Sequence, residues 1–114
     1  MENEMTQIQM LYTKPEVGDS IDTVDTPALI IDLDVVDRNI EAMFAHFKDK
    51  SVTIRPHLKT AKSPVFAKKL IEMGATGICV AKLAEAEVMA QNEVGDILIT
   101  TEIYGKAKME KLFD

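Results

Sequence analysis

The chain of 114 residues has one cysteine, no tryptophan, few aromatic residues and no long apolar run. A single cysteine excludes an internal disulfide, and its apolar neighbours, residues 77–81, predict that Cys79 is a small buried core residue. The apolar runs are too short to span a bilayer, and the acidic N-terminus lacks the hydrophobic stretch of a secretory signal. These absences predict a protein of the reducing cytoplasm that does not associate with membranes.

The chain also lacks an excess of basic residues. Residues 1–50 carry 11 acids and 4 bases, for a net charge of −7, whereas residues 51–114 carry 8 acids and 9 bases, for +1. Non-specific binding to nucleic acids needs a basic surface, and so does attraction to anionic lipids. The charge distribution therefore argues against nucleic-acid and membrane partners.

Two kinds of motif are missing. Neither GxGxxG nor GxxxxGK[ST] is present, so the sequence has no glycine-rich phosphate loop. No cluster of Cys and His has the spacing of metal ligands, so we predict no metal site in this chain. His46 falls beside the apolar stripe of a predicted helix, and we interpret it as structural.

Strands and helices are predicted to alternate after a polar lead-in. Residues 1–24 have no sustained period and are expected to be poorly ordered, apart from a turn at 17–20. Apolar spacing, helix caps and turn residues delimit the elements that follow. Strands are expected at about 28–33, 52–59, 77–82 and 96–101, and helices at about 35–48, from Ser63-Pro64 to Gly74, at 83–92 and at 106–113.

This order predicts an α/β fold of right-handed βαβ units with a parallel sheet. A closed barrel of eight such units needs roughly 250 residues. Residues 25–114 are therefore expected to form either an open sheet or the first part of a truncated (β/α)8 barrel. The chain ends within a predicted helix and without a cap, which we interpret as a sign of truncation.

Three polar side chains are predicted to share one face of the strand at 52–59. Because side chains alternate along a strand, Arg55, His57 and Lys59 lie on the same side. Ligands of α/β proteins bind at the carboxyl ends of the strands, where Lys59 and, one strand later, Lys82 are both expected. A partly desolvated lysine there can form a Schiff base with a carbonyl. From position alone both lysines remain candidates, with Lys59 favoured by its basic neighbours.

Five blocks of the sequence resemble the D-threonine aldolase / D-serine dehydratase family, whose N-terminal domain is similar to alanine racemase. The most specific is Arg55-Pro56-His57-Leu58-Lys59-Thr60 followed by Lys62-Ser63-Pro64. In the same order and spacing come Thr26-Pro27-Ala28-Leu29, Asp32-Leu33-Asp34 with Arg38-Asn39-Ile40, Val80-Ala81 with Glu85-Ala86-Glu87, and Asp96-Ile97-Leu98-Ile99.

The resemblance implies a (β/α)8 TIM barrel that binds pyridoxal 5'-phosphate, followed by a β-rich domain. It implies that Lys59 is the Schiff-base residue, with His57 and Arg55 as its cofactor-binding surroundings. The implied activity is that of a lyase which cleaves or dehydrates D-3-hydroxyamino acids. Family members usually also bind a divalent metal through residues near their C-terminus, and those ligands lie outside this sequence.

The sequence leaves four alternatives open. The chain could be an N-terminal fragment of such a lyase that is inactive by itself, or a racemase of the same barrel family. It could be a non-catalytic protein that binds pyridoxal phosphate. It could also be a truncated product that associates with itself, as a homo-oligomer, to cover the open edges of a partial barrel. The residues that separate aldolase from dehydratase from racemase lie beyond position 114.

Overall fold

The computed structural model describes residues 14–113 and divides the chain into two units, residues 1–32 and 33–114. In the first unit the amide of Asp19 donates to the carbonyl of Glu16, which closes a turn one residue earlier than the predicted turn at 17–20. A short 3-10 helix, η1 (Ile21–Thr23), follows. The predicted disorder of the lead-in falls mostly on residues 1–13, which lie outside the described residues.

The prediction of a strand at 28–33 is wrong. Residues 28–32 are irregular, and Leu33 is already the first residue of helix α2 (Leu33–Phe47). A run of β-branched and apolar residues becomes a strand only when another strand supplies hydrogen-bond partners for its backbone. Among the described residues, the sheet consists of two other strands, and Leu29 stays almost fully exposed.

The helices of the second unit match their predicted positions closely. α2 begins two residues before the predicted helix at 35–48, and Asp34 lies in its first turn. α3 (Pro64–Glu72) starts at the predicted proline and stops before Gly74, whose φ of +107° suits a residue without a side chain. α4 (Leu83–Gln91) and α5 (Lys106–Phe113) follow as predicted.

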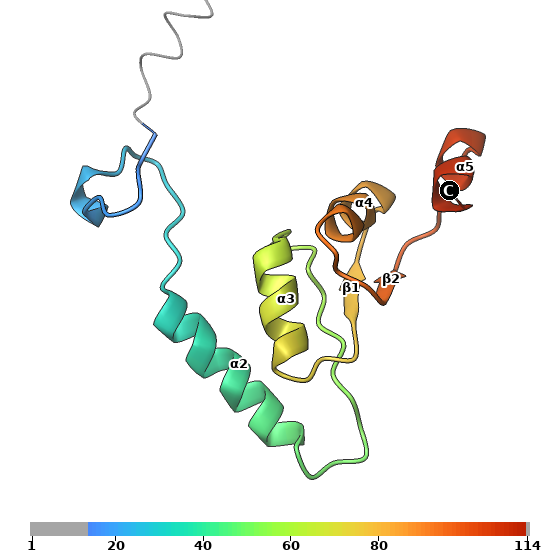
Figure 1. The fold of residues 1–114 in the computed structure, drawn as a ribbon, viewed down its shortest axis with the longest axis horizontal. Coiled ribbons are helices and arrows are strands. Elements are labelled where there is room, and N and C mark those ends of the chain that lie inside the picture. Colours follow the sequence, from blue (N-terminus) through green and yellow to red (C-terminus); the bar gives the residue numbers. More distant parts are fainter. Residues whose placement is uncertain (1–13, 114) are drawn as a thin grey trace, which may run out of the picture. The chain divides into compact units, whose positions relative to one another are not determined.

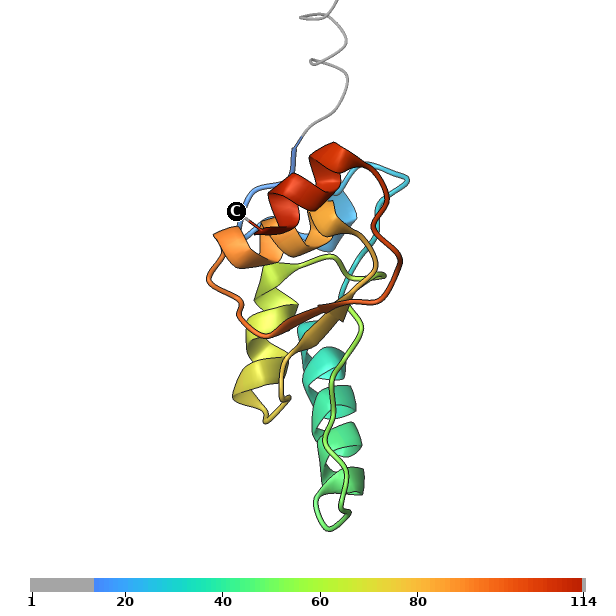
Figure 2. The same cartoon turned by 90° about the vertical axis from the view of Figure 1, so that its right-hand side faces the viewer.

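Strands β1 (Ile78–Val80) and β2 (Ile97–Ile99) pair in parallel, with Ile78 opposite Ile97 and Val80 opposite Ile99. This confirms the predicted α/β fold with parallel βαβ units. Ile78 and Val80 are fully buried in a core to which α3 and α4 contribute Ala67 and Met89. Figures 1 and 2 show α3 and α4 beside these strands. The opposite face of β2 is open, and Leu98 is 51% exposed there.

The segment predicted as a strand at 52–59 is extended but joins β1 through one bridge, between His57 and Cys79. The amide of Leu58 donates to the carbonyl of Cys79, and the amide of Cys79 donates to the carbonyl of Pro56. A further bridge toward the start of the segment would need an N–H at position 56, which proline lacks. Pro56 therefore limits the pairing, although the segment keeps its predicted place beside β1.

Candidate functional site at the carboxyl edge of the strands

The candidate site lies where the 52–59 segment, β1 and β2 all end. His57, Cys79 and Leu98 stand opposite one another across the three segments. Because successive side chains alternate between the two faces, His57 lies on the face away from the helices, and Leu58 is buried on the helix side. This alternation brings His57 and the residues after it to one edge, as the sequence predicted.

The ring of His57 is held at both nitrogens. The backbone N–H of Lys59 donates to Nδ1 at 3.1 Å, and Nε2 lies 3.0 Å from the hydroxyl of Thr100, the first residue after β2. The Thr100 hydroxyl in turn donates to the carbonyl of Val80 at 3.2 Å. The imidazole therefore connects the end of the 52–59 segment with the ends of β1 and β2.

Lys59 follows in a tight loop and is exposed. The loop closes through the amide of Lys62, which donates to the carbonyl of Leu58 at 2.8 Å. Across residues 14–113, no carboxylate lies within ion-pairing distance of the Lys59 amine. Lys59 is thus an exposed lysine without an ionic partner in this part of the chain.

Glu85 in the first turn of α4 is a site residue that sequence reasoning missed. Its carboxylate accepts hydrogen bonds from the amides of Ala81 and Lys82 at 2.9 and 3.2 Å, and it pairs with the Lys62 amine at 3.3 Å. These backbone hydrogen bonds, Ala81 first, and then Lys62 lower the pKa of Glu85. The sequence contained a partial signal, because a Glu three residues into a helix often accepts from the N-cap amide.

Arg55 lies at the opposite edge, where the same strands begin. Its guanidinium donates to the carbonyl of Asp96 at 2.8 Å and to that of Thr76 at 3.4 Å, and it pairs with the Asp96 carboxylate at 3.0 Å. The guanidinium contacts residues at the starts of β1 and β2, whereas His57 contacts Thr100 at the end of β2. The structure thus brings His57 and Lys59 together and does not bring Arg55 to them. The cofactor-binding role of Arg55 stays a prediction.

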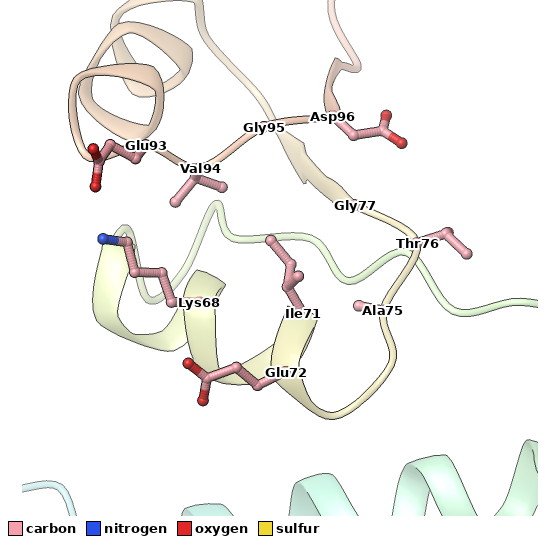
Figure 3. Close-up of a pocket in the computed structure, with 10 residues that line it drawn as sticks. All are labelled: Lys68, Ile71, Glu72, Ala75, Thr76, Gly77, Glu93, Val94, Gly95 and Asp96. Carbon is pink, nitrogen blue, oxygen red and sulfur yellow. The ribbon is translucent and has the colours of Figure 1, made fainter.

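A pocket of about 480 Å³ opens at this amino edge, between α3 and the loop that enters β2 (Figure 3). Ile71 and Val94 give it an apolar wall, and Lys68, Glu72 and Glu93 stand around it. None of His57, Lys59 and Lys82 lines this pocket. The pocket lies at the amino ends of the strands. In α/β barrels the residues at this end contribute to stability, whereas ligands bind at the carboxyl ends, so the pocket is separate from the candidate site.

Other predicted candidates have simpler surroundings. Lys82, the alternative reactive lysine, is the N-cap residue of α4 and is exposed. Cys79 is buried as predicted. Within residues 14–113, no group of three or more His, Cys, Asp or Glu is placed to hold a metal ion. In the same part of the chain, no helix has the length and apolar character needed to cross a membrane.

Comparison with known proteins gives the family. The profile of the alanine racemase N-terminal domain matches residues 31–113. The chain belongs to this family. It is 36% identical over 112 residues to D-threonine aldolase of Arthrobacter sp, which covers 98% of this chain and 30% of that relative. It is 40% identical over 91 residues to 3-hydroxy-D-aspartate aldolase of Paracoccus denitrificans, covering 78% of this chain and 23% of the relative.

Solved structures agree with this assignment. The D-threonine aldolase of Filomicrobium marinum has a TM-score of 0.75 and 45% identity, over 78% of this chain and 24% of that one. D-threo-3-hydroxyaspartate dehydratase of Delftia sp. has a TM-score of 0.73 and 37% identity, over 80% and 24%. The predicted resemblance is therefore confirmed, and the chain spans less than a third of the length of these relatives.

Proposed function

We propose that this chain supplies the lysine-bearing part of a pyridoxal-phosphate-dependent lyase that acts on D-3-hydroxyamino acids, with Lys59 as the Schiff-base residue. The observation that carries the proposal is the position of Lys59. Lys59 is exposed at the carboxyl edge of parallel strands, its backbone N–H donates to the ring of His57, and its amine has no ionic partner among residues 14–113. The names of the relatives, D-threonine aldolase and two enzymes of 3-hydroxyaspartate, supply the substrate class.

The residues at this edge fit the cofactor. A Schiff base requires an accessible primary amine, and Lys59 offers one on a loop that a backbone hydrogen bond closes. His57 accepts a hydrogen bond from the backbone N–H of Lys59 and is exposed at the same edge. When bound, pyridoxal phosphate supplies an electron sink for negative charge at the α-carbon of an amino acid. The contribution of this chain is the attachment and orientation of the group.

Finer properties of the whole protein belong to the same proposal. We expect a D-amino acid as the small-molecule substrate, a homo-oligomer and a cytoplasmic location, as the sequence predicted. A divalent metal is expected in a longer protein, and one solved dehydratase relative is described in a metal-free form. Aldol cleavage would release an aldehyde from a D-3-hydroxyamino acid, whereas dehydration would release a keto acid.

Covalent trapping tests the lysine assignment without relying on turnover. The 114-residue chain is incubated with stoichiometric pyridoxal phosphate, reduced with borohydride and mapped by peptide mass spectrometry, which reports every lysine at once. We expect the adduct on Lys59, and we expect Lys59→Ala to lose both the adduct and the visible absorption of the bound cofactor. The matched control is Lys82→Ala, which should label normally. Equal labelling of the two lysines, or no adduct, would overturn the proposal.

A further inference from the structure

The hydrogen bonds around His57 form a continuous chain whose two ends are backbone groups. It starts at the N–H of Lys59, passes through Nδ1 and Nε2 of His57 to the Thr100 hydroxyl, and ends at the carbonyl of Val80. Thr100 lies 43 residues after His57, so the chain connects parts of the molecule that are distant in sequence.

The backbone groups at the two ends determine where the protons lie. A backbone N–H can only donate, so Nδ1 of His57 must accept and carries no proton. A backbone carbonyl can only accept, so the Thr100 hydroxyl donates its single proton to the carbonyl of Val80. The hydroxyl can then only accept from the ring, and the proton of His57 must be on Nε2. Each donor in the chain has one acceptor, and no other arrangement satisfies all three contacts.

We propose that Thr100 is a positioning residue: its hydroxyl accepts from the Nε2–H of His57 and so fixes the orientation of the ring, while the backbone N–H of Lys59 keeps Nδ1 free of a proton. Both ring nitrogens are then engaged by the protein itself. His57 therefore presents a ring of fixed orientation at the carboxyl edge. The tautomer follows from the hydrogen bonds alone, and its consequence for the cofactor rests on the proposed function.

Three variants distinguish the effect of the Thr100 hydroxyl from the effect of the side-chain volume. Thr100→Val keeps the volume and removes the hydroxyl, and Thr100→Ser keeps the hydroxyl and removes a methyl group. Thr101→Val is the matched control, because Thr101 also follows β2 and donates its hydroxyl to a different carbonyl, that of Ala81.

The measurement is the protonation of the two ring nitrogens of His57, observed by long-range ¹H–¹⁵N NMR of protein that contains ¹⁵N-labelled histidine. His46 supplies an internal reference. We expect His57 of all four proteins to be protonated on Nε2, because the backbone N–H of Lys59 is unchanged, and we expect only Thr100→Val to lose the signal of a hydrogen-bonded Nε2–H. A wild-type ring protonated on Nδ1, or an unchanged Nε2–H signal in Thr100→Val, would overturn the proposal. If Thr100→Val fails to fold, the wild-type and serine spectra still decide it.

Cofactor labelling gives the functional consequence. We expect Thr100→Val to slow borohydride-trapped labelling of Lys59 about fivefold, the factor expected for the loss of one hydrogen bond, while Thr101→Val labels at the wild-type rate. Equal rates for the two variants would contradict the positioning role. If wild-type Lys59 is not labelled, the proposed function fails, and the NMR pattern still tests the tautomer by itself.

Discussion

The two edges of the parallel strands use similar side chains in opposite ways. At the amino edge, the Arg55 guanidinium is surrounded by acceptors, namely the carbonyls of Thr76 and Asp96 and the Asp96 carboxylate. At the carboxyl edge, four residues along the same segment, the Lys59 amine has no ionic partner among residues 14–113. Arg55 lies in the extended segment and Lys59 in the loop that follows it, and the two cations differ in their neighbours.

The difference between the two cations suggests a division of roles, with the amino edge contributing to stability and the carboxyl edge to ligand attachment. A cation that is paired and hydrogen-bonded fastens the strands to one another, whereas an unpaired amine adds little to folding and stays available to a ligand. The division agrees with the general rule that parallel α/β folds bind ligands at the carboxyl ends of their strands. Substitutions at the amino edge should therefore change stability, and substitutions at the carboxyl edge should change cofactor attachment.

The largest loss of stability is expected from Gly77→Ala at the amino edge. A Cβ at Gly77 would lie 2.2 Å from a guanidinium nitrogen of Arg55 and 2.4 Å from the backbone carbonyl of Asp96, and its φ of +148° is unfavourable for alanine. The arginine can move but the carbonyl cannot move alone, so we expect a loss of about 3 kcal/mol in the free energy of unfolding, measured by urea denaturation.

The control for this prediction is Gly95→Ala, two residues before β2. A Cβ there meets no atom within 4 Å, so its effect should stay within about 0.5 kcal/mol. Similar losses in the two variants would show that the close approach of Arg55 and Asp96 to Gly77 is not what makes this edge sensitive.

A smaller loss is expected when the arginine itself is replaced. Arg55→Met keeps most of the side-chain length but removes the contacts to Thr76 and Asp96, so its denaturation midpoint should fall. Arg38→Met, on the exposed face of α2, should leave the midpoint unchanged. If Arg55→Met is as stable as Arg38→Met, the guanidinium does not hold the amino edge together.

The Arg55–Asp96 pair should also show in the pH dependence of stability. The hydrogen bond from Arg55 lowers the pKa of Asp96 in the folded chain. Such a group stabilises the fold fully above the unfolded pKa of 3.8, and this contribution disappears as the pH falls through the lower folded pKa. The difference in midpoint between wild type and Asp96→Asn should therefore close below pH 3.8, and a constant difference would contradict the pairing.

The features that sequence could predict are those set by neighbouring residues. The start of α3 at Ser63-Pro64 and its stop at Gly74 follow from local backbone preferences, and so does the alternation that placed His57 and Lys59 together. The early end of pairing at Pro56 was also predictable, because a proline has no N–H for a parallel ladder. The prediction of a strand at 52–59 did not take this constraint into account.

The features that sequence could not predict depend on contacts between distant residues. Residues 28–33 have the composition of a strand, but a strand needs a partner that composition does not name. The attachment of Arg55 to Asp96 spans 41 residues and that of His57 to Thr100 spans 43. An alternation pattern predicts which side chains share a face, and only the three-dimensional structure assigns each of them a partner.

A still smaller, pH-dependent effect is expected from Glu85→Gln at the carboxyl edge. The amides of Ala81 and Lys82 and the Lys62 amine lower the pKa of Glu85, so its carboxylate stabilises the fold above the unfolded pKa of 4.5 and loses this effect as the pH falls through the lower folded pKa. We expect Glu85→Gln to lower the denaturation midpoint at pH 7 and to match the wild type in strong acid.

Glu87→Gln is the matched control for Glu85. Glu87 lies on the same helix and pairs with Lys111 of α5, whereas Glu85 pairs with Lys62 in the loop that carries Lys59. Its midpoint at pH 7 should change little, as is usual for a surface ion pair. If Glu87→Gln lowers the denaturation midpoint more than Glu85→Gln does, Glu85 is not the carboxylate of α4 that stabilises the fold.

The smallest change in stability is expected from Lys59→Ala, although this substitution should abolish cofactor attachment. The Lys59 side chain is exposed and has no ionic partner among residues 14–113, while its backbone N–H, which alanine retains, makes the contact to His57. The free energy of unfolding should therefore stay within about 0.5 kcal/mol of wild type in the absence of cofactor. A destabilised Lys59→Ala would mean that the amine holds the carboxyl edge together much as Arg55 holds the amino edge, and the contrast between the two edges would not stand.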